Sequence, residues 1–523
     1  MCRRNWKGRL FMRQKDYGLN RISLSRGYAD AIAERGGRRS LCRHFPVLLM
    51  VGMWSAGSAG GQPPPRISQA NAVRIAELEA ERGKVYTREG PLGTVTRELY
   101  IPYPRPNVSS VICCGYEGHT GLRRYEVLTY QVFDDVYQDA EKRTSDDNGK
   151  TWSAWEPDPE TDIYFEGDYS WQRFVPVGPS PGCYDAESRR IVQPYSMATF
   201  KADPRKIGLS ETNYHLFWRT SADNGRTWTE GRMIKYEDGP DFARDRLRAP
   251  HYMATNSGVY YYNVLPLKTG GVIFPADTPV RITAADGQTQ TLSGVRCFLG
   301  TWEPKTQEYV WKASAPVTIP LELSGYLAEP WLAELKDGRL LLDLRGTNRG
   351  AKDPKAPGRH WYALSGDGGR TWSPVKDWRY DDGSQFFSPA TMAKLLRHST
   401  TGKLYWFGNI SRGPTSGNSP RYPLYMAEVD ETTPAIKRST LTVIDDYDPQ
   451  RHTPAVQFSN FYVFENRRTR EFEVYLSPYG QYKNVYQASV YKYTIRLKNV
   501  SSPPAASIPS VQASDTPRPA TQP

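Results

Sequence analysis

The sequence is poor in the residues that carry metal, redox and serine-hydrolase chemistry. It holds 7 histidines and 6 cysteines among 523 residues. No cysteine spacing matches a zinc site, no glycine-rich loop suits a phosphate, and no Ser-His-Asp set stands out. We therefore expect neither a metal nor a cofactor. The cysteines are Cys2, Cys42, Cys113, Cys114, Cys183 and Cys297.

Long apolar runs and a basic stripe are also missing. The apolar run from Phe45 to Trp54 is too short for a stable membrane span. The formal net charge is +12, but residues 1–44 hold 12 Lys or Arg against 3 Asp or Glu, and the remainder holds 56 against 53. Because the body of the chain is nearly neutral, we expect no nucleic-acid partner.

The N-terminal region has the features of an export signal. Arg38, Arg39 and Arg43 precede the apolar run, and the small residues from Ser55 to Ala59 follow it. This order predicts a signal peptide at about residues 38–59 and a secreted or periplasmic protein. An uncleaved membrane anchor is the alternative. In an exported chain a disulfide is possible, but adjacent cysteines at 113 and 114 equally fit a buried strand, so no bridge is assigned.

Composition divides the rest of the chain. We expect residues 1–59 to form the leader, and residues 60–85 to form a linker with a short helix between Ser68 and Arg82. Strand-like segments with many of the 34 tyrosines and 14 tryptophans fill residues 86–498. Residues 499–523 are rich in Ser, Pro and Ala, which predicts a disordered tail.

A repeated motif, S-x-D-x-G-x-T-W, determines the expected architecture. It occurs at residues 145–152, 221–228 and 365–372. The starts are 76 and 144 residues apart, and 144 is twice 72, so one unit without the motif should lie near residue 293. The sequence there predicts two strands around a Glu-Pro-Lys-Thr-Gln turn at residues 303–307. Units of roughly 72 residues made of short strands are typical of propeller blades. The sequence therefore predicts an all-β fold, a β-propeller with six blades, with seven blades as the alternative.

The acidic residue of each motif suits a turn. Its carboxylate can accept backbone N–H bonds, and the following glycine tolerates a positive φ. We interpret Asp147, Asp223 and Asp367 as structural residues and not as catalytic ones.

One segment outside the repeats combines an acid and a base. The stretch from Glu329 to Arg345 predicts two strands joined by an Asp337-Gly338 turn. The two ends of such a hairpin lie side by side, which places the carboxylate and the guanidinium at one rim of the propeller. An ordinary cross-strand ion pair is the alternative interpretation.

Together with the three repeats, this segment resembles the sialidase (neuraminidase) superfamily, whose repeats are known as Asp boxes or BNR repeats. The resemblance covers roughly residues 90–480. It implies a catalytic role for Glu329 and a substrate-carboxylate ligand in Arg345. The segment from Asn409 to Leu424 resembles the family's next arginine segment and implies a second ligand, Arg421. The implied substrate is an acidic glycan, whose carboxylate suits bidentate arginine bonds.

Two positions depart from the family pattern. Tyr100, in Tyr100-Ile101-Pro102, stands where the family has the third arginine, and Phe458 stands where the family has its tyrosine nucleophile. Tyr462 is the nearest tyrosine that follows. The family's acid/base aspartate has several candidates, so we keep a set of possible pocket and acid/base residues, which are Tyr100, Glu117, His119, Asp134, Asp135, Asp139, Phe458 and Tyr462.

Three functions remain open from the sequence. The first is a secreted sialidase-like glycoside hydrolase that acts on a sialic or uronic acid. The second is a propeller lyase or rhamnosidase-type enzyme on uronate polysaccharides, with His119, Tyr100 or Tyr116 and Arg345 on one face. The third is a propeller that binds carbohydrate without catalysis.

Overall fold

The computed structural model describes residues 78, 80–102, 109–133, 136–174, 182–207, 211–283, 287–481 and 488–500. The chain divides into two compact units, residues 1–72 and 73–523, and every described residue lies in the second. Of the helix predicted between Ser68 and Arg82, residues 78, 80 and 81 are described and helical. The predicted leader and tail lie outside the described residues, except for Asn499 and Val500.

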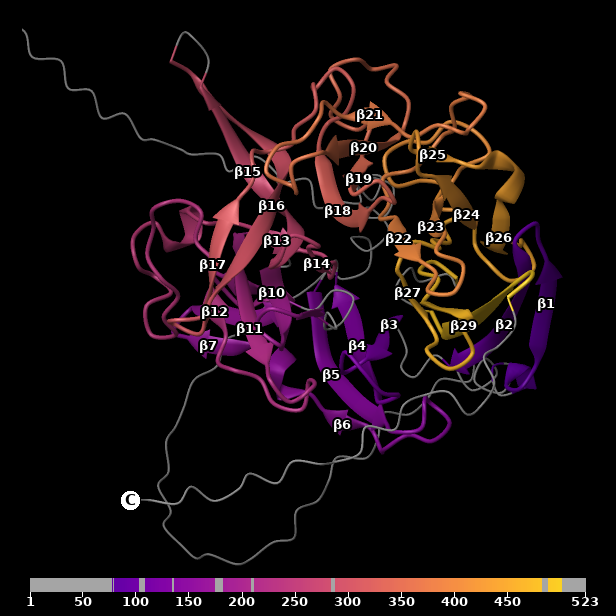
Figure 1. Ribbon diagram of the computed structural model, residues 1–523, viewed down its shortest axis with the longest axis horizontal. Helices are drawn as coiled ribbons and strands as arrows, with labels where there is room; N and C mark the ends of the chain where they lie inside the picture. Colours follow the sequence, from indigo (N-terminus) through magenta and orange to yellow (C-terminus); the bar gives the residue numbers. More distant parts are fainter. Residues whose placement is uncertain are drawn as a thin grey trace, which may run out of the picture. The chain divides into compact units, whose positions relative to one another are not determined.

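Six antiparallel sheets stand around a common axis, as the six blades of a propeller (Figure 1). The prediction of an all-β propeller is confirmed, and the number of blades is six. Blade 1 contains β3 Ser109–Tyr116, β4 Arg124–Phe133, β5 Val136–Ser145 and β6 Glu156–Pro157. Blade 2 contains β7 Tyr164–Glu166, β8 Tyr169–Phe174, β9 Cys183–Asp185, β10 Arg190–Phe200, β11 Thr212–Ser221 and β12 Arg232–Met233.

Blades 3 to 5 follow in sequence order. Blade 3 contains β13 Val259–Tyr260, β14 Leu265–Pro266, β15 Val272–Thr283, β16 Thr289–Glu303 and β17 Glu308–Ala313. Blade 4 contains β18 Leu327–Glu334, β19 Leu340–Gly346, β20 His360–Ser365 and β21 Lys376–Asp377. Blade 5 contains β22 Lys394–Arg397, β23 Leu404–Asn409, β24 Leu424–Asp430, β25 Ala435–Ile436 and β26 Thr442–Asp445. The unit expected near residue 293 is blade 3, whose β16 and β17 enclose the predicted Glu-Pro-Lys-Thr-Gln turn.

Blade 6 joins strands that are far apart in the sequence. Its order is β1-β2-β29-β28-β27, where the strands are β1 Val85–Glu89, β2 Gly93–Ile101, β27 Phe461–Glu465, β28 Phe472–Leu476 and β29 Val490–Leu497. β2 pairs with β29 from Gly93↔Leu497 to Ile101↔Val490. Alternate residues of β2 are buried, as expected for a strand with one face on a core. The first described strands therefore close the ring onto the last.

Helical structure is short in the described part of the chain. It consists of the helical residues 78, 80 and 81, of α2 Pro204–Ile207, and of three single 3-10 turns, η1 Pro159–Thr161, η2 Tyr252–Ala254 and η3 Arg438–Thr440. No helix among the described residues is long and apolar enough to cross a membrane. Large aromatic side chains fill the space between blades, and Trp378, Trp406 and Phe458 are among the fully buried ones. Their burial provides the main free energy that holds neighbouring sheets together.

Candidate functional site

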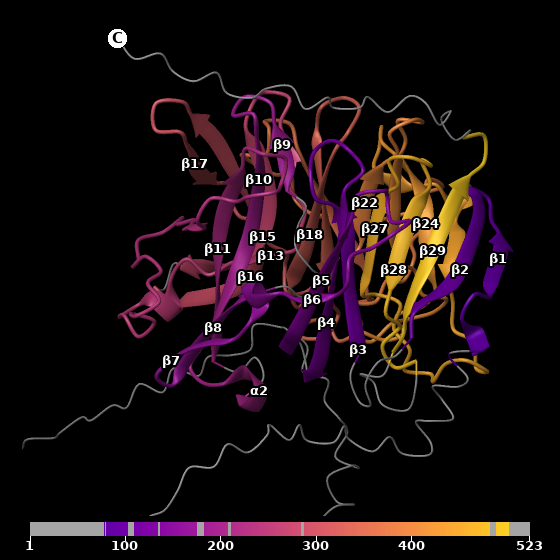
Figure 2. The same cartoon turned by 90° about the horizontal axis from the view of Figure 1, so that it is seen from below.

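Strand direction defines two ends of the propeller. The inner strands β3, β18, β22 and β27 all begin at one end and finish at the other. We call the first the Glu329 end, because Glu329 is near the start of β18. The opposite end carries the turns at residues 145–152, 221–228 and 365–372, so we call these the repeat turns and this end the repeat-turn end. In the view of Figure 2, α2 lies at the Glu329 end and β9 at the repeat-turn end.

The repeat turns are held by their aspartates, as interpreted from the sequence. In the second turn, Asp223 accepts bonds from the Thr227 amide (2.8 Å), the Thr227 hydroxyl (2.6 Å) and the Ser221 hydroxyl (2.8 Å). Although its partial burial raises the pKa of Asp223, these bonds lower it to about 2. Asp147 and Asp367 make the same contacts in their turns. With their oxygens occupied in this way, these carboxylates stabilise the turns.

The hairpin predicted from Glu329 to Arg345 is present, and its two ends meet. β18 pairs with β19, with Ala328 opposite Arg345, and the pairing is irregular between Ala328 and Trp331. Glu329 sits in this irregularity with a φ of 48°, an unusual value for a residue other than glycine. Bulges of this kind redirect side chains at functional sites. Here the bulge brings the Glu329 carboxylate into an ion pair with Arg345.

Arg345 is the buried member of this pair. Its side chain is 4% exposed, whereas that of Glu329 is 14% exposed. The second terminal nitrogen, Nη2, donates to Asn418 Oδ1 at 3.2 Å. Burial lowers the pKa of Arg345, but the Glu329 carboxylate, together with Tyr326 and Tyr261, outweighs burial and raises it overall. The guanidinium therefore stays charged, with Glu329 as the carboxylate that balances it.

Asp277 adds a second carboxylate beside Glu329. It lies on β15 of the neighbouring blade, close to the Glu329 backbone N–H and to the Tyr261 side chain. Burial and the charge of Glu329 raise the pKa of Asp277 well above its usual value, and its polar neighbours Tyr261, Glu329 N–H and Arg345 offset only part of this rise. The result is a buried carboxyl group with a raised pKa next to an ion-paired carboxylate, a combination that suits general acid–base chemistry.

Tyr326 completes the cluster. The Arg345 Cζ lies 5.6 Å from the centre of the Tyr326 ring. The Tyr326 hydroxyl is buried and has no hydrogen-bond partner among the described residues. A buried hydroxyl of this kind is a candidate for contact with a bound molecule. We call Tyr261, Asp277, Tyr326, Glu329 and Arg345 the Glu329 cluster.

Sequence reasoning found two of these five residues. Asp277, Tyr261 and Tyr326 were missed, because each lies on a strand or strand end that carries no family motif. One signal was present, since Asp277 interrupts the apolar strand that begins Val272-Ile273-Phe274. A lone carboxylate in a buried strand is costly unless it is protonated or bonded.

Arg421 lies at the same end but is engaged elsewhere. Its Nη1 donates to the Gln457 side chain (2.8 Å) and the Ser459 hydroxyl (3.2 Å), and its Nη2 donates to the Ala390 carbonyl (2.9 Å). These bonds connect the segment between β23 and β24 to the segments that precede β22 and β27. A substrate carboxylate would have to replace one of them, so the role of Arg421 as a ligand stays a prediction.

The two departures from the family pattern are a half-buried residue, Tyr100, and a fully buried one, Phe458. The Tyr100 hydroxyl hydrogen-bonds Glu126 (2.5 Å) and accepts from Arg143 (2.9 Å) between blades 6 and 1. Phe458 is fully buried and packs edge-on against His452, with ring centroids 5.3 Å apart. Tyr462 is buried next to Lys394, whose Nζ lies 4.5 Å from its ring centre. None of these three contacts the Glu329 cluster in a described interaction.

The expectation that His119 or Tyr116 shares a face with Arg345 is wrong, and the position of Glu117 follows the same pattern. Glu117 and His119 lie in the turn between β3 and β4, at the repeat-turn end, together with Tyr116 at the end of β3. They are therefore not on the face of Glu329 and Arg345, because β3 carries the chain across the propeller before this turn. Asp139 is an exposed residue of β5. Asp134 and Asp135 lie outside the described residues.

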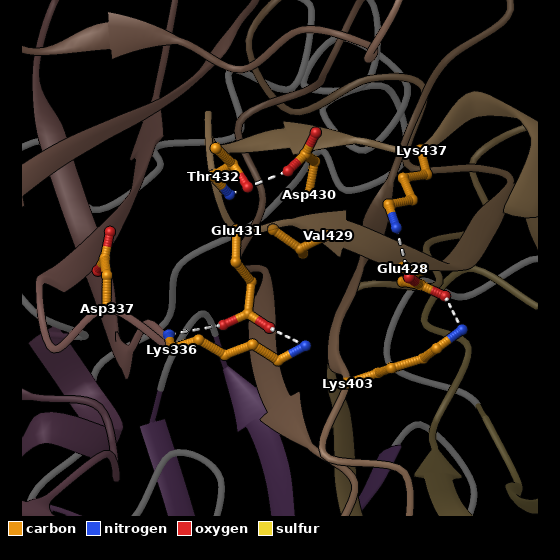
Figure 3. Close-up of a pocket in the computed structure, with 9 residues that line it drawn as sticks. All are labelled: Lys336, Asp337, Lys403, Glu428, Val429, Asp430, Glu431, Thr432 and Lys437. Carbon is orange, nitrogen blue, oxygen red and sulfur yellow. Dashed lines mark hydrogen bonds and ion pairs between the residues drawn. The ribbon is translucent and has the colours of Figure 1, made fainter.

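A pocket of about 330 Å³ at the repeat-turn end has a charge-balanced lining, in which acidic side chains pair with lysines. Figure 3 shows Glu428 between Lys403 and Lys437, and Glu431 facing Lys336. Each carboxylate in these contacts has a lysine partner. Within the described ranges, no group of three His, Cys, Asp or Glu residues could hold a metal ion.

Comparison with known proteins gives similarities of fold. No family model and no curated protein matches the chain. Among solved structures, it is similar to the NanB sialidase of Streptococcus pneumoniae (TM-score 0.45, 12% identity, 80% of this chain and 70% of that one). It is also similar to the intramolecular trans-sialidase of Ruminococcus gnavus (0.42, 12%, 78% and 99%) and to a thermostable family-43 glycoside hydrolase (0.33, 12%, 66% and 98%). At such identities the similarity assigns no role to any residue.

Proposed function

We propose that this protein is a secreted glycoside hydrolase that acts on an acidic sugar, sialic or uronic, at the Glu329 end. One observation carries the proposal. The bulge at Glu329 places an ion-paired carboxylate, a buried carboxyl group with a raised pKa and a buried arginine in one cluster. The arginine suits the carboxylate of the sugar, and the two acids suit cleavage of its glycosidic bond. Secretion rests on the export signal expected at residues 38–59.

In the order of events that we propose, binding of the substrate frees Glu329 from its ion pair with Arg345, so that Glu329 can act as a base. The sugar carboxylate binds Arg345 and replaces Glu329 as its partner. Glu329 is then free to remove a proton from the nucleophile, and Tyr326, three residues earlier, is the candidate. The Tyr326 oxygen attacks the anomeric carbon as the glycosidic bond breaks, and Asp277 donates its proton to the leaving oxygen. Water, which gives a proton to Asp277, then displaces the Tyr326 oxygen from the anomeric carbon, and Glu329 returns its proton to Tyr326. Each of these steps uses a side chain of the Glu329 cluster.

The test is hydrolysis of two fluorogenic substrates, a sialoside and a glucuronide, by the wild type and by Glu329→Gln and Asp277→Asn. We expect one substrate to release its fluorophore and each variant to lose activity by about 10²–10⁴-fold, the usual contribution of a general acid or base. Glu431→Gln is the matched control, because Glu431 also pairs with an arginine, Arg397, but lies at the other end. It should keep wild-type activity.

A stability measurement separates catalysis from folding. Because the folded-state pKa of Asp277 is raised, its contribution to stability is fully present below pH 4 and is lost as the pH rises towards the folded pKa. Asp277→Asn should therefore be as stable as the wild type, or more stable, at pH 7, by on the order of 1 kcal/mol for each unit of the shift. The difference should shrink near pH 4.

Other results would point to the alternatives. A product with a new carbon–carbon double bond, detected by its ultraviolet absorbance, would indicate a lyase. Binding of the sugars by a folded protein without turnover would indicate a carbohydrate-binding propeller. Full activity in Glu329→Gln would contradict the proposed site.

A further inference from the structure

A second pocket lies between blades 1 and 2 at the repeat-turn end, away from the Glu329 cluster. Its volume is about 510 Å³. It is bounded by the β3–β4 turn, the start of β10 and the repeat turn at 221–228. Its lining includes His119, Thr120, Tyr184, Ser188, Arg189 and Arg190, and no lining residue is acidic.

The walls of this pocket are fixed by contacts between blades. Asn224 Oδ1 accepts from the backbone amides of His119 (2.8 Å) and Thr120 (3.3 Å), and its amide donates to the Thr120 carbonyl (3.2 Å). On the other side, Arg467 of blade 6 donates to the carbonyls of Gly118 and Gly121. Because the turn is held from both neighbouring blades, the pocket is formed before any ligand binds, which lowers the entropic cost of binding.

The positive charge in this pocket is not compensated within it. Arg189 and Arg190 form no ion pair with any carboxylate in the described part of the chain. Nearby carboxylates are engaged elsewhere, since Asp185 bonds Tyr309 and the Ser188 amide, and Glu117 pairs with Arg123. This arrangement contrasts with the charge-balanced pocket of Figure 3. Two arginines without carboxylate partners favour an anionic group.

The remaining lining suits a sugar ring. His119 stacks on Tyr184 with ring centroids 4.2 Å apart and an interplanar angle of 13°. Burial and the charge of Arg467 lower the pKa of His119, which favours an uncharged stack. Thr120 and Ser188, which carry hydroxyl groups, also line the pocket. Aromatic surface beside hydroxyl groups is the pattern of a small-molecule site with a few placed polar contacts.

We propose that this pocket binds an acidic saccharide unit, with Arg189 and Arg190 on its carboxylate or sulfate and the His119–Tyr184 stack beside its ring. A polyanion such as nucleic acid is disfavoured, because residues 45–523 are nearly neutral and supply no extended basic track. The pocket would be a second binding site that holds about one sugar unit of an acidic glycan and leaves the Glu329 end open. The proposal is independent of catalysis, since it concerns binding alone.

The test is isothermal titration of the full chain with digalacturonate, 3′-sialyllactose and a sulfated disaccharide, compared between wild type and Arg189→Gly. Arg189 has a φ of 56°, so glycine removes the charge without straining the backbone. We expect at least tenfold weaker binding of one acidic sugar to Arg189→Gly and to Arg190→Gln. Whether the preferred sugar carries carboxylate or sulfate identifies the anion.

Two controls make the result specific. Arg226→Gln removes an exposed charge from the same repeat turn without touching the pocket lining, and it should bind as the wild type does. Glu329→Gln changes the other end of the propeller, and this variant should still bind the acidic sugar at the second pocket. Equal affinities for Arg189→Gly and Arg226→Gln would overturn the proposal, as would tighter binding of a nucleoside monophosphate than of any acidic sugar.

Discussion

At the scale of single residues, Lys394 is the most unusual side chain of the propeller. It is fully buried on the inner strand β22, and its Nζ donates to the Phe461 carbonyl at 2.7 Å. The rings of Trp331, Phe461 and Tyr462 surround the ammonium group at 4.5–5.3 Å. Burial lowers the pKa of Lys394 to about 8, although the nearby Cys113 and Cys114 act in the opposite direction.

This lysine should make stability depend on pH in the alkaline range. The unfolded chain binds its proton more tightly than the folded protein, since the ordinary pKa is 10.5. The lysine therefore costs stability below pH 8, and the stability of the wild type should rise between about pH 8 and 10.5. The full change is roughly 3 kcal/mol, from about 1.4 kcal/mol per pKa unit. Lys394→Met removes the titration, so the difference between wild-type and variant free energies of unfolding, measured by urea titration, should vary over this range. Parallel curves would contradict the prediction.

The residues that the sequence predicted are those with local partners. Glu329 and Arg345 belong to one hairpin, so a turn signal and a residue count place them together. Asp277 and Tyr261 meet Glu329 only through the packing of blade 3 against blade 4, which no spacing in the sequence encodes. Arg421 was placed at the correct end by its motif, but its partners Gln457 and Ala390 come from separate segments.

At the scale of elements, the repeat turns also act as spacers between blades. The glycine of the second turn, Gly225, has a φ of 90°, and a Cβ there would lie 2.4 Å from the Glu117 carbonyl. The equivalent Gly369 in the third turn has a φ of 89°, and its Cβ would meet the ends of side chains, Ile273 at 2.3 Å and Leu340 at 3.2 Å. Both positions require a positive φ. The group nearest to an added Cβ is a backbone carbonyl at Gly225 and a side chain at Gly369.

Alanine at these two positions should therefore have different costs. Both Gly225→Ala and Gly369→Ala lose about 1 kcal/mol because alanine is strained at positive φ. Gly225→Ala should lose at least about 1 kcal/mol more, because a backbone carbonyl cannot move aside as a side chain can. Urea titrations of the two variants at pH 7 give the comparison. Equal losses of stability would show that the repeat turn at 221–228 does not pack closely against the β3–β4 turn.

The sequence predicted elements where a repeat or an alternating pattern was strong. The three repeat turns and the strands around them are of this kind, and so is the β16–β17 hairpin. The inner edge of blade 2 is different, because β8 and β9 share the position beside β10. Neither strand is long enough to leave a clear pattern of alternation, so tertiary pairing determines them.

At the scale of the whole molecule, the pairing of β2 with β29 closes the ring. Thr96 lies opposite Thr494, and its hydroxyl donates to the Thr494 carbonyl at 3.4 Å. Opposed residues in antiparallel strands have Cα atoms about 4.5–5.5 Å apart, which is within the range of a disulfide. A cross-link here would join strands from the two ends of the propeller.

We expect the double variant Thr96→Cys with Thr494→Cys to be stabilised when oxidised. A cross-link that closes so long a loop restricts the unfolded chain, and typical gains are about 2–4 kcal/mol. The reduced form of the same variant is the control and should unfold as the wild type does. The four described cysteines of the native chain are buried or half-buried, which favours the engineered pair. No difference between oxidised and reduced forms in thermal unfolding would show that opening of blade 6 does not limit stability.

Closure by distant strands also has a consequence for how the protein is made. On the ribosome, β1 and β2 emerge before any other described strand, and their partner β29 is the last to appear. Until then the edge of β2 that will receive β29 offers unpaired backbone groups to any other extended chain. Biosynthesis therefore includes an interval in which five blades can be complete while an open edge persists. During this interval the nascent propeller is most exposed to misassembly with its neighbours.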